Sequence, residues 1–143
     1  MITPTQQQST AERDRELTEY LYTSLRVLPN DIGGNEAQSA SLVNSKREAA
    51  QRLEDVEINF SFGFEYKATN ETGRKAELKA ALLKSPDYIA ARKELLSYEN
   101  AIEIQQAENT GKRREFQAAI ALAELHAARI NMIAKLQRPA DVK

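Results

Sequence analysis

The chain of 143 residues contains no cysteine, no tryptophan and a single histidine. Without cysteine it has no disulfide, no thiolate nucleophile and no sulfur ligand for a metal. No stretch approaches the roughly 20 apolar residues that a membrane helix needs. Residues 1–8 lack the basic start and the apolar run of a signal peptide. We therefore expect a cytoplasmic protein that makes no contact with membranes.

Glycine and proline are also scarce, with five and four residues, so the chain does not have the composition of a loop-rich or disordered protein. Hydrophobic residues make up 41% and charged residues 29%. The charges are unevenly distributed, because residues 1–66 carry 6 basic and 11 acidic side chains whereas residues 67–143 carry 14 and 10. Opposite net charges favour contact between the halves, within one chain or between antiparallel copies, over binding of a polyanion.

Leucines at helical spacing predict a first helix in the N-terminal part of the chain. Ser9 and Glu12 have the spacing of a capping box, so we expect this helix to begin there, after a disordered tail over 1–8. Pro29, followed by Asn-Asp and Gly-Gly pairs, predicts that the helix ends in a turn. A second helix with a weaker apolar stripe is expected from Asn35 onward. The leucines of the first stripe are Leu17, Leu21, Leu25 and Leu28.

Residues 56–67 have two interpretations. Apolar and polar side chains alternate strictly, which is typical of a half-buried strand. The same residues also continue the helical stripe, and no other segment supplies a partner strand. We favour the helix, and a short β segment stays open. The aromatic residues of this segment are candidates for a core or a partner interface: Phe60, Phe62, Phe64 and Tyr66.

A short helix is expected over 71–83, and the strongest start signal in the chain follows it. Ser85 supplies a hydroxyl at the cap, Pro86 occupies the first helical position, and Asp87 lies near the positive end of the helix dipole. This signal predicts that the longest helix of the chain begins here.

From Tyr88 onward, residues at heptad spacing form a seam that is apolar at both ends and polar in the middle. Because Asn109, Thr110 and Gly111 are poor helix formers, the chain either continues as one helix of about fifty residues, roughly 75 Å long, to Arg138 or turns at Gly111. We favour the continuous helix, because one glycine costs only about 1 kcal/mol. The heptad seam comprises Tyr88, Ala91, Leu95, Tyr98, Ile102, Gln105, Asn109, Lys112, Phe116, Ala119, Ala123, His126, Ile130 and Ile133.

Together these elements predict an all-α fold, an elongated helical hairpin or antiparallel coiled-coil-like bundle with a long C-terminal helix. We expect a single helical domain over 9–138 and a C-terminal tail over 139–143. The seam needs another helix to cover it, from the same chain or from a second copy, so we expect a homo-oligomer. The seam residues expected at a partner interface are Leu95, Ile102, Phe116 and Ile130.

The sequence has few residues in arrangements suited to catalysis. His126 lies on the predicted seam, and Glu124, two residues away, falls on a different face of the helix, so the two make a poor acid–base pair. Gly33 and Gly34 lack the Lys and Ser or Thr that complete a phosphate-binding loop. We therefore predict a protein that is not an enzyme and that has no cofactor or metal site.

A nucleic-acid-binding accessory factor, of the kind used in replication or recombination, is the alternative. Lys112, Arg113 and Arg114 form the densest basic run, and Arg74 and Lys75 extend a basic track that could contact phosphates. Acidic residues interrupt this track, and the net charge of the chain is −1. A solvated or intersubunit role is therefore favoured over a nucleic-acid site.

The segment from Asn70 to Ile130 has a further pattern, carried by Asn70, Glu71, Arg74, Lys75, Tyr88, Leu95, Glu99, Arg113, Arg114, Glu115, Phe116, Ala123, Glu124 and Leu125. In this pattern the chain resembles small orphan proteins encoded by bacteriophages and prophages. The resemblance implies an accessory role in a phage-like context and supports a helix before Thr69. We therefore predict a homo-oligomeric helical interaction protein that acts through contacts with another protein.

Overall fold

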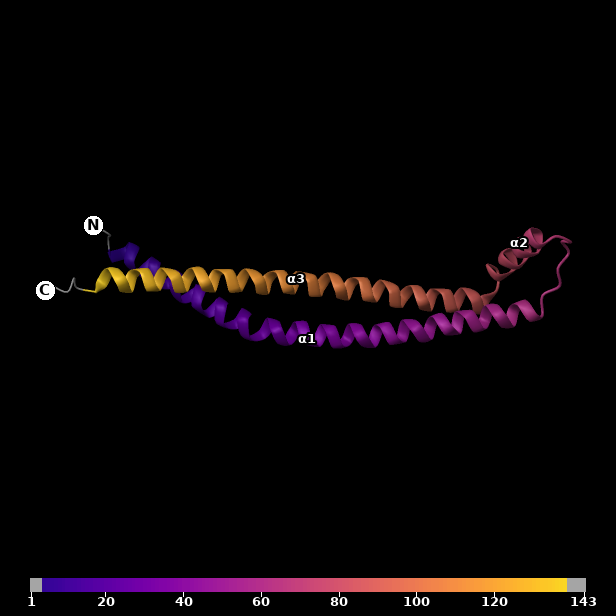
Figure 1. The fold of residues 1–143 in the computed structure, drawn as a ribbon, viewed down its shortest axis with the longest axis horizontal. Coiled ribbons are helices and arrows are strands. Elements are labelled where there is room, and N and C mark those ends of the chain that lie inside the picture. The colour runs from indigo at the N-terminus through magenta and orange to yellow at the C-terminus, as the bar shows by residue number, and fades with distance from the viewer. Residues whose placement is uncertain (1–3, 139–143) are drawn as a thin grey trace. The chain divides into compact units, whose positions relative to one another are not determined.

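The computed structural model describes residues 4–138, and it describes side chains from residue 10 onward. This part of the chain contains three α-helices and no strand. α1 covers Pro4–Phe62, α2 covers Glu71–Leu82 and α3 covers Pro86–Gln137 (Figure 1). α1 packs against the long α3 in a hairpin-like bundle, which confirms the predicted all-α fold.

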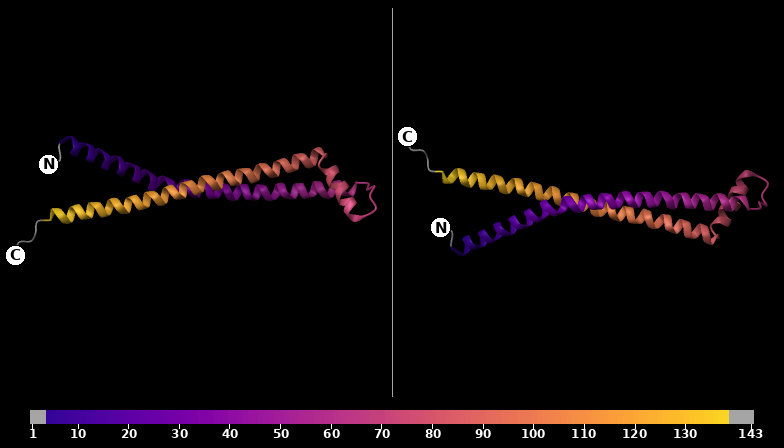
Figure 2. Two further views of the ribbon diagram at one scale, coloured as in Figure 1. Left: turned by 90° about the horizontal axis from the view of Figure 1, so that it is seen from above. Right: turned by 90° about the horizontal axis from the view of Figure 1, so that it is seen from below.

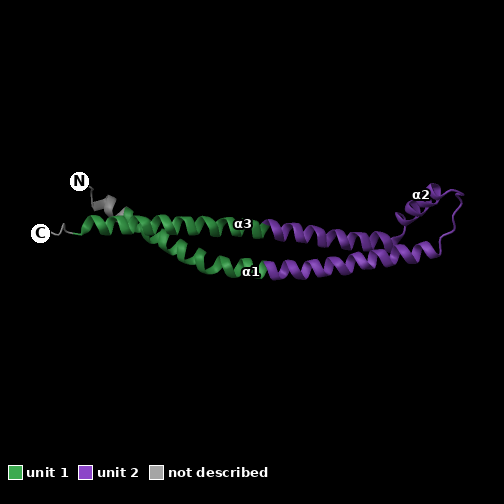
Figure 3. Ribbon diagram, in the orientation of Figure 1, with its two compact units in different colours: residues 1–35, 108–143 green, residues 36–107 purple. Residues whose placement is uncertain are grey.

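The chain divides into two compact units (Figure 3). Unit 1 comprises Met1–Asn35 and Glu108–Lys143, so it pairs the N-terminal part of α1 with the C-terminal part of α3. Unit 2 is Glu36–Ala107 and contains the remaining parts of both helices together with α2. Within unit 2, the stretches of α1 and α3 lie side by side in all three views (Figures 1 and 2). The prediction of a single domain over 9–138 did not include this division.

Ion pairs in unit 1 show that α1 and α3 run antiparallel there. Asp14 on α1 pairs with Arg129 on α3 at 3.0 Å. Asp31 pairs with Lys112 at 3.9 Å. A step of 17 residues forward on α1 therefore matches a step of 17 residues back on α3, as expected for two neighbouring helices that point in opposite directions.

The heptad seam is the face by which α3 packs against α1. Every seam residue from Tyr88 to His126 is buried or half-buried, whereas Ile130 and Ile133 are exposed. Ala119 is completely buried, as is Ala49 on α1, because small side chains allow close approach of the helices. α1 contributes its own seven-residue repeat of buried or half-buried side chains: Asp14, Leu21, Leu28, Asn35, Leu42, Ala49 and Val56.

α1 continues through Pro29 and the two glycines that follow it, so the predicted turn and the predicted end of the first helix are wrong. A proline inside a helix costs about 3 kcal/mol, and a glycine about 1 kcal/mol. The seven-residue repeat crosses this stretch without interruption, and Leu21 and Leu28 are buried. Burial of each leucine contributes about 1.5–3 kcal/mol, so packing against α3 outweighs the local preference for a turn.

Replacing Pro29 by alanine should stabilise the chain by up to about 3 kcal/mol, because alanine restores the amide that donates to the carbonyl of Leu25. Pro29 is exposed, so no packing is lost. The measurement is the midpoint of thermal unfolding, followed by circular dichroism. Pro86→Ala is the matched control, because proline at the first position of α3 replaces no helical hydrogen bond and its removal should change the midpoint little. A lower midpoint for Pro29→Ala would contradict the claim that Pro29 destabilises α1.

The ends of α1 differ from those predicted. The helix begins at Pro4, ahead of the capping box at Ser9, so residues 4–8 belong to a helix and not to a tail. Residues 1–3 and the predicted C-terminal tail, 139–143, lie outside the described residues. At its other end α1 stops at Phe62, so the favoured helical interpretation of 56–67 is right up to this residue. Residues 63–70 form an irregular connection to α2 and contain no strand.

The helices of the second half lie where they are predicted. In α2, Asn70 is the cap, and its side-chain oxygen accepts a hydrogen bond from the amide of Gly73 at 2.7 Å. α3 begins at Pro86 and passes through Gly111 without a break, which confirms the favoured continuous helix. No helix within residues 4–138 is long and apolar enough to cross a membrane.

Candidate interaction surfaces

Aromatic side chains gather where α1 ends and the connection to α2 begins. The rings of Phe60 and Phe64 stack with centroids 5.8 Å apart, and Phe64 meets Tyr66 edge to face at 5.0 Å. Phe62, the fourth aromatic residue predicted for an interface, is 86% exposed. Three of the four rings thus contact one another, although Tyr66 is also 40% exposed.

Three of the four predicted interface residues on the seam are covered by the chain itself. Leu95 and Ile102 in unit 2 and Phe116 in unit 1 are half-buried on the face that packs against α1. Ile130 is exposed. The sequence left open whether the seam is covered by the same chain or by a second copy. As far as His126, the same chain covers it.

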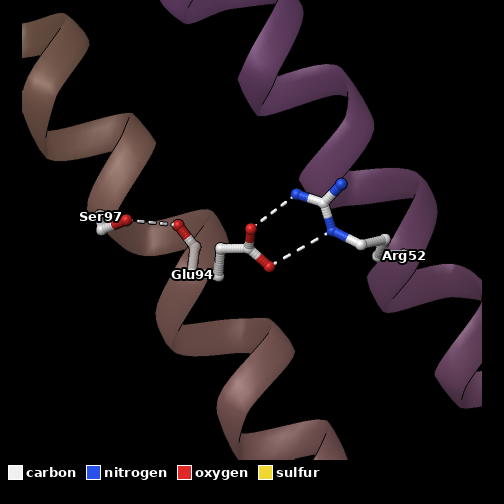
Figure 4. A network of polar contacts seen from close by, with 3 residues as sticks. All are labelled: Arg52, Glu94 and Ser97. Atoms are coloured by element: carbon white, nitrogen blue, oxygen red, sulfur yellow. Dashed lines mark hydrogen bonds and ion pairs between the residues drawn. The ribbon is translucent and has the colours of Figure 1, made fainter.

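In unit 2, α1 and α3 are joined by a two-pronged ion pair (Figure 4). Nη2 of Arg52 donates to Oε1 of Glu94 at 2.6 Å, and Nε donates to Oε2 at 3.3 Å. Ser97 Oγ donates to the carbonyl of Glu94 at 2.7 Å. The hydrogen bond with Glu94 raises the pKa of Arg52, so on the alkaline side the contribution of the pair is lost only as pH rises through the raised pKa of arginine. Both side chains are exposed, so solvent screens the pair and its contribution to stability is small.

A second ion pair in unit 2 follows the same antiparallel register. Lys46 on α1 pairs with Glu99 on α3 at 3.5 Å. Lys46 lies six residues before Arg52, and Glu99 lies five residues after Glu94. Exposed pairs of this kind contribute little stability. Their value here is that they show which stretches of α1 and α3 are neighbours.

Polar side chains lie buried in the middle of the seam. Gln105 and Asn109 on α3 are buried, as the polar middle of the heptad pattern requires. Among the described residues, Nδ2 of Asn35 and Oδ1 of Asn109 lack a hydrogen-bond partner. Both side chains belong to unit 1, where Asn35 lies four residues after Asp31 and Asn109 three residues before its partner Lys112. A buried polar residue in such a seam lowers stability and disfavours other registers.

Most of the basic residues predicted for nucleic acid are engaged within the chain. Arg74 Nε donates to the carbonyl of Ala68 at 3.1 Å, and Lys75 pairs with Glu71 at 2.7 Å. The remaining three lie in unit 1. There Lys112 pairs with Asp31, Arg113 is also engaged, and Arg114 is exposed.

A second heptad stripe, which the sequence analysis missed, lies on the exposed side of α3 in unit 1. We call it the outer stripe. Leu122, Leu125, Met132 and Leu136 are 39%, 68%, 59% and 78% exposed, and Arg129 lies between them. The five positions are separated by three, four, three and four residues, which is the spacing of the heptad seam itself. That spacing could have revealed the stripe in the sequence.

His126, the single histidine, is half-buried on the seam, and its Nδ1 has no hydrogen-bond partner among the described residues. Nowhere in the described part of the chain do three or more His, Asp or Glu side chains gather so that they could hold a metal ion. Comparison of the chain with protein families, with curated proteins and with solved structures found no match.

Proposed function

We propose that the chain is a non-enzymatic, homo-oligomeric interaction protein that acts through protein–protein contacts of its helical faces. The observation that carries this proposal is the thin core. Among the residues whose side chains are described, no large side chain is fully buried, and eighteen large hydrophobic side chains are exposed. Two packed helices cover only one face of each other, and exposed apolar patches of ordered spacing are typical of surfaces that bind protein.

The outer stripe is matched to a second copy of itself. Arg129 lies at its centre, with Leu122 seven residues before it and Leu136 seven residues after it. Leu125 precedes Arg129 by four residues and Met132 follows it by three. If two stripes pair antiparallel about a two-fold axis at Arg129, each apolar side chain meets an apolar side chain of the second copy. The paired segments extend over about 21 Å at 1.5 Å per residue.

The charge at the centre of the stripe is compatible with such pairing. Arg129 is the single charged member of the stripe, and its guanidinium is bound to Asp14 of the same chain at 3.0 Å. Two copies would therefore bring two Arg–Asp pairs to the axis, and not two uncompensated cations. Alternating charges of this kind favour association, whereas bare like charges oppose it.

Sedimentation velocity over about 1–100 μM tests the proposal. The outer stripe is short, and small interfaces belong to weak complexes, so we expect a dimer with a dissociation constant in the micromolar range. A reversible shift from monomer to dimer across this range is the expected result. A chain that stays monomeric at tens of micromolar would refute the proposed self-association.

A phage-type accessory role stays a prediction that rests on the resemblance of residues 70–130. The nucleic-acid alternative has less support than self-association. Arg74, Lys75 and Lys112 make contacts within the chain, and binding of phosphates would have to compete with these contacts.

A further inference from the structure

An apolar groove opens in unit 2, where the turn after α2 meets the first turns of α3. Leu83, Ile89 and Leu96 line it and are 47%, 50% and 53% exposed. The groove has a volume of about 370 Å³. An adjoining hollow of about 400 Å³ shares Leu83 and Leu96, together with Tyr88 and Arg92. The two hollows share these four residues and form one open surface with an apolar part along Leu83, Ile89 and Leu96, which we call the α2–α3 groove.

Basic side chains border the α2–α3 groove and have no counter-ion. Lys79, Arg92 and Lys93 line its two hollows and are exposed. Within residues 10–138, no hydrogen bond or ion pair engages these three side chains. The positive charge of the groove is therefore available to a partner.

Three carboxylates of unit 2 are bound by other groups of the chain. Glu94 is held by Arg52, and Glu99 is held by Lys46, both on α1. Glu77 on α2 accepts a hydrogen bond from the amide of Lys67 at 2.9 Å. Glu99 lines the second hollow, but its charge is paired with Lys46, so the charges of the groove that lack a partner among residues 10–138 are those of Lys79, Arg92 and Lys93.

We propose that the α2–α3 groove binds an acidic amphipathic helix of another protein. Ile89 and Leu96 lie two helical turns apart, about 10.5 Å, which matches apolar side chains at seven-residue spacing on a helical partner. Acidic side chains beside that apolar stripe would pair with Lys79, Arg92 and Lys93. A nucleic acid would use the basic border alone and would gain nothing from the apolar floor, so the combination favours a peptide.

The inference rests on the protein–protein part of the proposed function, but it uses a different surface from self-association. The groove lies in unit 2 and the outer stripe in unit 1. A monomeric chain that binds the acidic helix would refute homo-oligomerisation and retain the groove. A dimeric chain that ignores the acidic helix would refute the groove and retain homo-oligomerisation.

The test is fluorescence anisotropy of the full chain with a labelled synthetic helix that has leucines on one face and glutamates elsewhere. A second helix with lysine in place of glutamate serves as the control, and a DNA duplex serves as a polyanion without an apolar face. We expect the acidic helix to bind and the basic helix not to bind. The variants Leu96→Asp and the double variant Arg92→Glu, Lys93→Glu should each weaken binding by about tenfold or more.

Ile104→Asp is the matched variant, because Ile104 is an exposed aliphatic residue of α3 in unit 2 that does not line the groove. It should leave the affinity unchanged. If Leu96→Asp disturbs the fold, as judged by circular dichroism, the charge-reversal variant at Arg92 and Lys93 decides. The inference is overturned if the basic helix binds equally well, if the duplex binds in place of the acidic helix, or if the groove variants match Ile104→Asp.

Discussion

A chain that carries Leu125→Lys and Met132→Lys is expected to be monomeric at concentrations at which the unaltered chain forms dimers. Both side chains are well exposed, so the substitutions should leave the packing of α1 against α3 intact. In the proposed dimer, however, they place ammonium groups in an apolar contact without a counter-ion, which is strongly unfavourable. We expect the dissociation constant to rise by about a hundredfold or more, measured by sedimentation equilibrium.

The matched control for this prediction replaces two exposed apolar residues of unit 2, Val43→Lys and Ile104→Lys. It adds the same charge but leaves the outer stripe unchanged, so the dimer should persist. Circular dichroism should show the same helix content for both double variants. Equal dissociation of the two double variants would mean that added charge, and not the outer stripe, controls association.

Leu28→Asp should destabilise the chain by about 4 kcal/mol or more, which is the second large effect that we expect. Leu28 belongs to the seven-residue repeat of α1 and is buried in unit 1, and the substitution removes its apolar packing and buries a carboxylate. The loss falls beside Pro29 and two glycines, where α1 depends on packing for its helical state. We expect a lower midpoint of thermal unfolding and loss of amide protection in this part of α1, measured by hydrogen exchange.

Val27→Asp is the control, because Val27 is the preceding residue and is exposed. A carboxylate there costs about 1 kcal/mol or less, since no core contact is lost. If both variants lost stability equally, packing against α3 would not be what keeps α1 helical through Pro29.

The second half of the chain was predictable because its local and long-range signals agree. Pro86 carries the start signal of α3, and the residues from Tyr88 to His126 keep strict heptad spacing, so one face of the helix is specified throughout. A single glycine, Gly111, is too weak a signal to break a helix that is packed along its length.

The first half was harder to predict because its signals conflict. Pro29 indicates a turn locally, and only the packing of Leu21 and Leu28 against α3, which no short window of sequence contains, keeps the helix continuous. Between 56 and 67, aromatic residues alternate so that they fit the period of a strand as well as that of a helix.

The candidate surfaces were less predictable than the fold. The outer stripe was missed because Arg129 interrupts its apolar residues, and only the structure shows that this arginine is bound to Asp14. The α2–α3 groove was missed because its lining comes from α3 and from residues before it, among them Leu83. Such a surface depends on how two elements pack, so its residues do not form a periodic pattern in the sequence.

Disulfide cross-linking tests the central claim, that two outer stripes meet antiparallel at Arg129. The chain has no cysteine, so Arg129→Cys introduces the sole thiol. A disulfide requires Cβ atoms about 4 Å apart, a distance that residues at a two-fold axis can reach. We predict that Arg129→Cys forms a covalent dimer on mild oxidation, whereas Asn131→Cys, which points to nearly the opposite side of α3, does not. Equal cross-linking of the two variants, or none at position 129, would contradict the claim.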